Sequence, residues 1–240
     1  MKAVSFFSSI GGMDYAWKYE GGDIVGACEQ DEFRRDVYTQ HFGKPAWFER
    51  DAYNLTSPPP DADIWIAGHA VLCLTQLIEV MNTSYRPNWI WFETMLEAHV
   101  GEMLLIPLAA LGYRCDLGAF DAADFGLAES RTRLNLIGNR VNADCSWLKE
   151  KHHNPWPACQ CTPGVMSYGS VAAAEIAQGF SEGYTSLHTG SYENVNALKR
   201  QALSGSVAIP AALWVAERLH RTMTGTRLAI ATYLESNKEV

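Results

Sequence analysis

The apolar positions of the chain form short runs that alternate with stretches of helical spacing. Apolar runs predict buried strands at residues 2–7, 23–29, 63–67, 89–92 and 133–138. Stretches with helical spacing lie between and after these runs, at residues 13–19, 31–41, 77–81, 101–111 and 210–223. Strands that alternate with helices are typical of a doubly wound, mainly parallel sheet.

A glycine turn follows the first predicted strand. Gly11 and Gly12 close this turn before the first helix, Glu29 ends the second strand, and Asp51 lies in the connection after the second helix. Glycine turns of this kind bind nucleotide cofactors, but they also occur as purely structural turns. Carboxylates at Glu29 and Asp51 suit a ribose and an adenine amino group. Their order and spacing favour a nucleotide-cofactor site.

Composition limits the domain count and the choice of partners. With 240 residues and 48% hydrophobic content, the chain suffices for one sizeable core and a small appendage. No apolar run reaches the roughly 18 residues of a membrane span, so we expect a cytoplasmic protein with no membrane partner. The six cysteines are scattered, which favours reduced thiols. A net charge of −8 argues against a protein whose whole surface binds the DNA backbone, since phosphate binding depends on Lys and Arg.

The periodic pattern is lost between residues 141 and 169, where Trp, His, Pro and Cys are frequent. We expect a small loop-rich insertion at residues 141–189, within one domain formed by residues 1–140 and 190–240. Five residues of zinc-binding type lie within seventeen positions of this insertion: Cys145, His152, His153, Cys159 and Cys161. Their spacing fits no common zinc-finger pattern, so we assign no metal site, with a structural zinc as the alternative to ordinary reduced cysteines.

Several segments, in order along the chain, resemble the DNA cytosine-C5 methyltransferases. Residues 6–12 correspond to the family's first glycine motif, and residues 124–133 end in Arg131-Thr132-Arg133, as the family's Gln-x-Arg-x-Arg segment does. Residues 178–184 resemble its Gln-Gly-Phe-Pro-x-x-Tyr segment, and residues 203–207 stand where Gly-Asn-x-Val is usual. The chain is therefore identified as a short, degenerate member of this family.

This resemblance implies a Rossmann-like fold, that of the class I S-adenosylmethionine-dependent methyltransferases, with S-adenosylmethionine as cofactor. It implies that Glu29 binds the ribose and Asp51 the adenine. The remaining cofactor-binding residues would be an aromatic that lines the pocket, together with the glycines of the turn: Phe6, Phe7, Gly11 and Gly12.

The resemblance also assigns catalytic roles, and here the chain departs from the family. The family attacks C6 of cytosine with the thiolate of a Pro-Cys-Gln loop, which makes C5 nucleophilic. In this chain Val71 stands at the position of that cysteine, and Cys73 follows two residues later, without the proline or the glutamine. Cys73 is the candidate nucleophile if the loop is remodelled; otherwise it is a buried, inert side chain.

The other catalytic candidates match the family better. Glu93 corresponds to the glutamate that hydrogen-bonds or protonates N3 of cytosine. Arg131 and Arg133 would hold the base, the attacking residue or a phosphate, and the alternative is a salt-bridged pair on the surface.

Three functions remain open within this family. The chain is an active DNA (cytosine-5-)-methyltransferase, a pseudoenzyme that acts as a regulatory or recognition partner, or a cofactor-using enzyme with changed chemistry. We expect DNA to bind weakly or with help from a partner, and a protein partner or homo-oligomer to be involved. A dinucleotide-binding oxidoreductase is disfavoured, because the turn lacks the G-x-G-x-x-G spacing.

Overall fold

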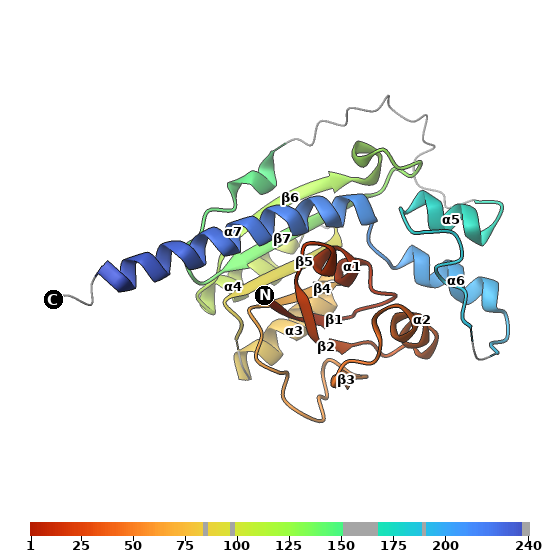
Figure 1. The fold of residues 1–240 in the computed structure, drawn as a ribbon, viewed down its shortest axis with the longest axis horizontal. Helices are drawn as coiled ribbons and strands as arrows, with labels where there is room; N and C mark the ends of the chain where they lie inside the picture. Colours follow the sequence, from red (N-terminus) through yellow and green to blue (C-terminus); the bar gives the residue numbers. More distant parts are fainter. Residues whose placement is uncertain (84–85, 97–98, 151–167, 189–190, 237–240) are drawn as a thin grey trace.

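A computed structural model describes residues 1–83, 86–96, 99–150, 168–188 and 191–236 (Figure 1). The strands are β1 (Lys2–Phe6), β2 (Asp23–Cys28), β3 (Trp47–Glu49), β4 (Ile64–Gly68), β5 (Trp89–Met95), β6 (Arg114–Asp121) and β7 (Thr132–Asn139). The α-helices are α1 (Gly12–Tyr19), α2 (Glu32–Phe42), α3 (Val71–Thr83), α4 (Ile106–Ala110), α5 (Val171–Ala177), α6 (Val195–Ser204) and α7 (Ile209–Ser236). Together they build an α/β fold.

The strands form one seven-stranded sheet in the order β3-β2-β1-β4-β5-β7-β6. Strands β1 to β5 run parallel to one another, whereas β7 is antiparallel to both of its neighbours, β5 and β6. The strand order reverses between β1 and β4, and such a switch point opens a crevice at the carboxyl ends of the strands. The predicted doubly wound, mainly parallel sheet is confirmed.

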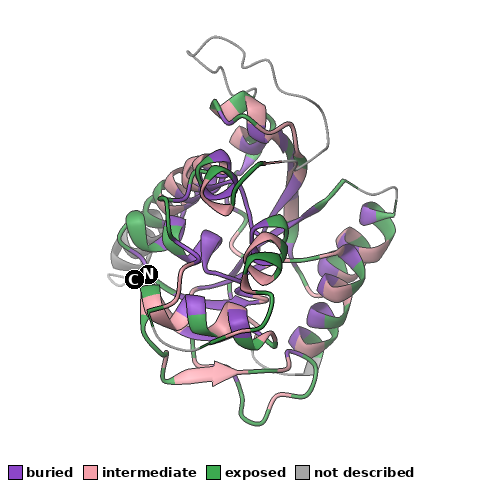
Figure 2. Ribbon diagram, turned by 90° about the vertical axis from the view of Figure 1, so that its right-hand side faces the viewer, coloured by how far each residue is buried: buried purple, intermediate pink, exposed green. Residues whose placement is uncertain are grey.

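The central strands are buried on both faces, so successive side chains enter two different cores. Val4 of β1 and Trp65 of β4 pack in the core that includes residues of α3 and α4. Ala3 and Ile64 pack in the core that includes residues of α1 and α7. Figure 2 shows the buried sheet strands enclosed by helices whose outer sides are exposed.

The sequence pattern missed two strands and two helices. The β3 strand has only three residues, all of them half-buried, which is too short for a periodic signal. Strand β6 contains Asp116 and Gly118 and exposes several positions, so its apolar run is interrupted. Helices α5 and α6 lie beyond the carboxyl ends of the central strands in Figure 1, where they cover one end of the sheet.

Helix α3 begins earlier than the sequence predicted. We expected a loop from His69 to Gln76, but the chain is helical from Val71 onward. Val71, Leu74 and Met81 recur at helical spacing and are buried against the sheet. No glycine or proline interrupts residues 71–83. The expected loop therefore shrinks to the few residues between β4 and α3.

Helix α7 runs along one face of the sheet and extends past its edge (Figure 1). Val215, Ala216 and Leu219 of this helix are fully buried in the core shared with α1. None of the helices in the described ranges combines the length and the apolar character that spanning a lipid bilayer requires.

Candidate active site

A cavity of about 390 Å³ lies at the carboxyl ends of β1, β2, β4 and β5. Its lining comes from the turn after β1, the ends of β2 and β5, the start of α2, the β4–α3 connection and the end of α6. These residues are Phe7, Ser9, Glu29, Gln30, Asp31, Arg34, Gly68, His69, Ala70, Glu93, Thr94, Met95, Arg133, Gln201, Ser204 and Gly205. The cavity thus brings two of the predicted acids, Glu29 and Glu93, into one site.

The Glu29 carboxylate is fixed by backbone amides. Its Oε2 accepts a hydrogen bond of 2.8 Å from the Ser9 backbone N–H, and its Oε1 accepts one of 2.9 Å from the Asp31 backbone N–H. The side chain is only 5% exposed, yet it lines the cavity. A carboxylate has about four lone-pair sites, so both oxygens keep acceptor capacity toward a ligand. This arrangement suits a pair of vicinal hydroxyls.

The two adjacent phenylalanines have different surroundings. Phe6 is fully buried in the core, with its ring 4.7 Å from that of Trp65. Phe7 has a left-handed backbone (φ 53°) and lines the cavity. Its ring centroid lies 4.8 Å from that of His69. Of the two candidates, Phe7 therefore offers the aromatic surface to the cavity.

The two glycines shape the turn and do not line this cavity. Gly11 adopts a φ of 86°, and a Cβ there would lie 2.1 Å from the Phe42 ring. A Cβ at Gly12 would lie 2.8 Å from Val207 and 2.9 Å from the Ser206 hydroxyl. Both positions let the turn pack closely against α2 and against residues 206–207.

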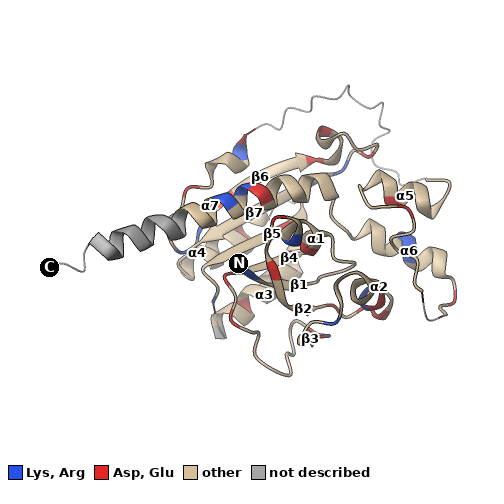
Figure 3. Ribbon diagram, viewed as in Figure 1, with Lys and Arg blue, Asp and Glu red and all other residues tan. Residues whose placement is uncertain are grey.

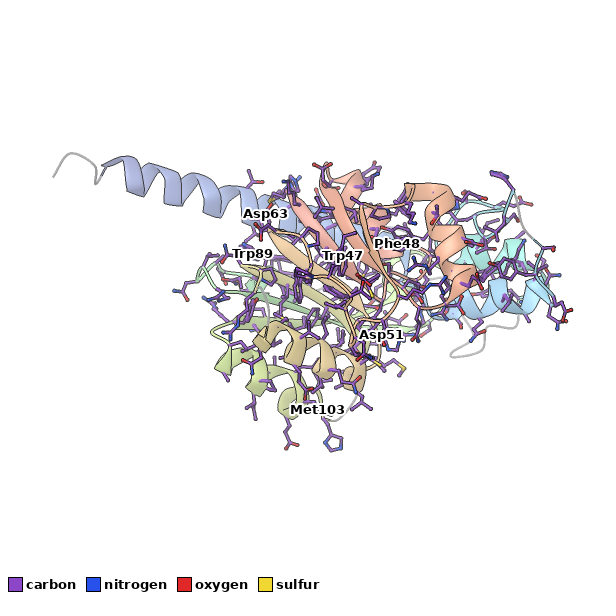
Figure 4. The ribbon with its side chains drawn as sticks, turned by 90° about the horizontal axis from the view of Figure 1, so that it is seen from below. Trp47, Phe48, Asp51, Asp63, Trp89 and Met103 are labelled. Carbon is purple, nitrogen blue, oxygen red and sulfur yellow. The ribbon has the colours of Figure 1, made fainter. Side chains whose placement is uncertain are left out.

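Asp51 lies farther along the same edge of the sheet, close to Trp47 and Phe48 of β3 (Figure 4). Its carboxylate accepts hydrogen bonds from the Asn54 side-chain amide (2.7 Å) and from the Tyr53 backbone N–H (2.9 Å). These bonds lower the pKa of Asp51 below its ordinary value. Asp51 is not among the residues that line the cavity.

Glu93 and Arg133 face each other in the cavity wall. Arg133 pairs with Met95 across β5 and β7, so its side chain shares a face with Glu93, two residues earlier on β5. The Arg133 Nε lies 3.8 Å from the Glu93 Oε1. Burial raises the pKa of Glu93 to about 7, whereas Arg133 and Arg131 act to lower it. Near neutral pH the Glu93 carboxyl therefore exchanges between acid and carboxylate.

Arg131 makes contacts within the protein. Its guanidinium donates to the backbone carbonyls of Ser206 (2.8 Å) and Ser204 (3.3 Å), and its Nε lies 3.7 Å from a Glu129 carboxylate oxygen. It thus ties the start of β7 to the segment between α6 and α7. Arg131 does not line the main cavity, whereas Arg133 does.

The candidate nucleophile lies on a helix. Val71 begins α3 and is 1% exposed, and Cys73 follows in the first turn, with its backbone N–H bonded to the Ala70 carbonyl at 3.0 Å. The half-buried Cys73 side chain neighbours Tyr53 and is not part of the cavity lining. The structure brings Glu93 and Arg133 to the cavity but not Cys73.

Sequence reasoning missed several cavity residues. Arg34, in the first turn of α2, and His69, in the β4–α3 connection, belonged to no motif in the sequence analysis. The position of His69 just after Gly68, at a strand end, was the one usable signal. Its backbone N–H donates to the Glu93 carbonyl at 3.0 Å, which holds the β4–α3 connection against β5.

Of the five candidate zinc ligands, the described residues include Cys145. Cys145 is fully buried in the core, and His152, His153, Cys159 and Cys161 lie outside the described residues. Among the residues that are described, no group of three or more His, Cys, Asp or Glu side chains has a metal-binding arrangement.

Comparison with known proteins identifies the fold. The Dnmt2 methyltransferase of S. pombe superposes with a TM-score of 0.72 at 15% identity, covering 92% of this chain and 99% of that one. The methyltransferase EhMeth of Entamoeba histolytica gives a TM-score of 0.66 at 11% identity, covering 94% and 98%. The sheet order, the cavity and these likenesses define the chain as a class I methyltransferase fold.

The sequence comparisons show a similarity to DNA cytosine methyltransferases. The sequence profile for C-5 cytosine-specific DNA methylases matches residues 1–69. The Type II methyltransferase M.HindV of Haemophilus influenzae is 25% identical over 170 residues, 62% of this chain and 56% of that protein. The Type II methyltransferase M2.BsuMI of Bacillus subtilis is 29% identical over 196 residues, which cover 71% of this chain and 50% of that protein. The chain is thus similar to C-5 cytosine-specific DNA methylases over residues 1–69 and to these Type II methyltransferases over most of its length, and it spans about half the length of these relatives.

Proposed function

We propose that this chain binds S-adenosylmethionine and a flipped cytosine in one cavity, as the donor and base site of a DNA cytosine-C5 methyltransferase. The observation that carries the proposal is the joint presence of Glu29 and Glu93 in one cavity at the switch point of the sheet. S-adenosylmethionine is the cofactor that the resemblance to the cytosine-C5 methyltransferases implies, and it would supply an electrophilic methyl group.

The residues around Glu29 fit this cofactor. The amide-bound Glu29 carboxylate would accept hydrogen bonds from both ribose hydroxyls, and the Phe7 ring would pack against the adenosine. Asp51, which is not part of the cavity lining, would accept a hydrogen bond from the adenine amino group after a movement of the segment that contains Tyr53 and Asn54. Gly11 and Gly12 would act through the shape of the turn.

The opposite wall fits the base. With a pKa of about 7, Glu93 is about half protonated at neutral pH and would donate a hydrogen bond to N3 of cytosine. Arg133, beside it, would orient the Glu93 carboxyl and contact the base. Arg131 would support the site through the segment 204–206.

The nucleophile is the missing element. A thiolate must reach C6 while Glu93 reaches N3 of the same ring, and a misplacement of about 1 Å can already cost about a hundredfold in rate. Cys73 points toward Tyr53 from a helix, so we propose that the chain alone does not methylate DNA. The second candidate, an active enzyme using Cys73, is favoured by one fact: Cys73 lies within one helical turn of Ala70, which lines the cavity.

The donor site is tested by calorimetric titration with S-adenosylhomocysteine. Loss of a charge-assisted hydrogen bond is worth about 1.5 to 3 kcal/mol, so Glu29→Gln should weaken binding by about 10- to 100-fold. Glu182→Gln, at an exposed glutamate away from the cavity, should bind as the wild type does. Equal affinities of Glu29→Gln and the wild type would contradict the assignment.

A further inference from the structure

Arg34 lines the cavity, and its guanidinium has no hydrogen-bond or ion-pair partner among the described residues. Its backbone N–H is capped by Asp31 at 2.8 Å, and its side chain is half-buried. The neighbouring Arg35 is fully engaged by comparison, donating to the carbonyls of Glu29 and Glu49. Arg34 therefore keeps its planar set of donors for a ligand.

Gly205 lies next to this guanidinium. Residue 205, which lines the cavity next to Arg34, carries no side chain. A Cβ at Gly205 would lie 3.4 Å from the Arg34 Nη2. The guanidinium thus extends into room that a larger residue at position 205 would restrict.

The two arginines of the cavity lining differ in their surroundings. Arg133 is the other arginine of the lining, and it is paired with Glu93 at 3.8 Å. Arg34 lies on the side of Glu29 and of the α6 end, where Ser204 and Gln201 add polar groups. With the ribose on Glu29, we place the amino-acid arm of the donor, which ends in a carboxylate, along the wall that contains Arg34.

We infer that Arg34 binds the amino-acid carboxylate of S-adenosylmethionine and thereby selects a donor that carries this group. Guanidinium and carboxylate match as planar, bidentate hydrogen-bonding partners. This inference rests on the proposed function, since it requires the donor to occupy the cavity. It adds the group that recognises the donor at the end opposite to the adenine.

The test compares two ligands that share the adenosine and the sulfur. S-adenosylhomocysteine carries the amino-acid carboxylate, and methylthioadenosine lacks the whole amino-acid arm. Arg34→Met should lower the affinity for S-adenosylhomocysteine about 10- to 100-fold. The affinity for methylthioadenosine should change less than about twofold. Arg34→Lys, which keeps the charge without the bidentate fork, should give an intermediate loss. Arg50→Met, at an exposed arginine outside the lining, is the matched control.

Each other outcome overturns the inference. An equal loss for both ligands, with a lowered melting temperature, would assign Arg34 a structural role. An unchanged affinity for S-adenosylhomocysteine would remove the contact altogether. Weaker binding of duplex DNA with unchanged donor binding would make Arg34 a phosphate contact. A wild-type protein that binds neither adenosyl ligand would contradict the proposed function itself, and this inference with it.

Discussion

At the residue scale, Glu93 combines burial with two nearby cations. Burial raises its pKa from 4.5 to about 7, and Arg133 and Arg131 oppose that rise. Because the folded-state pKa lies above the unfolded one, the stability linked to the neutral carboxyl is fully present below about pH 4.5. It is lost as the pH rises through about 7. The same pH range determines whether Glu93 can donate a proton, because its carboxyl is protonated below a pH of about 7.

We expect Arg133→Met to raise the pKa of Glu93 above its wild-type value of about 7, because the substitution removes a cation 3.8 Å from the carboxylate. Carbon-detected NMR titration of the glutamate carboxyls would measure the midpoint. Arg140→Met, at an exposed arginine after β7, should leave it unchanged. A Glu93 midpoint near 4.5 in the wild type, or a downward shift in Arg133→Met, would contradict this account of the site.

Single residues also show the limits of sequence reading at this site. Glu29 was predicted because it ends an apolar strand, whereas Glu93 was predicted because the family resemblance places its base-contacting glutamate there. Arg34 and His69 belong to no motif, and their place in the cavity depends on how α2 and the β4–α3 connection pack. That packing is a tertiary property, which the local pattern does not contain.

At the scale of elements, the glycine turn joins three parts of the fold. It leads from β1 into α1 and packs against Phe42 of α2 and against Val207 before α7. The strands and helices of this region were predicted because their periodicity is strong. The start of α3 was missed, because the family's loop was projected onto a segment whose spacing of Val71, Leu74 and Met81 is helical.

Gly12→Ala should destabilise the protein by about 1 to 3 kcal/mol, because the new methyl group would lie 2.8 Å from Val207 and force a shift of the packed segment. Gly101→Ala is the control, since a Cβ there meets nothing within 4 Å. Its effect should stay within about 0.5 kcal/mol. Urea unfolding measures both free energies, and equal values for the two variants would show that the turn is not tightly packed.

At the scale of the whole molecule, charge limits how the chain meets DNA. The net charge is −8, and Figure 3 shows Lys and Arg scattered among Asp and Glu over several elements. Phosphate contacts supply most of the affinity of DNA-binding proteins, so unaided DNA binding should be weak. The chain also spans about half of its relatives' length. The charge distribution thus predicts weak and salt-sensitive binding of duplex DNA by this chain.

The overall architecture could be predicted because an alternating pattern of strands and helices, together with the ordered family segments, leaves few topologies. The domain division and the role of the insertion stay predictions, since residues 151–167 lie outside the described part of the chain. The orientation of the Cys73 side chain, the candidate nucleophile, follows from the packing of α3 and is not contained in any sequence pattern.

The most direct test of the account is a covalent trap. The protein would be incubated with S-adenosylmethionine and duplex DNA containing 5-fluorocytosine, at a DNA concentration that saturates binding, and analysed by mass spectrometry. Fluorine at C5 cannot leave as a proton does, so an attacking thiolate stays bound to C6. We predict an unmodified protein mass. A covalent adduct that persists in Cys115→Ser and disappears in Cys73→Ser would contradict the account and establish Cys73 as the nucleophile.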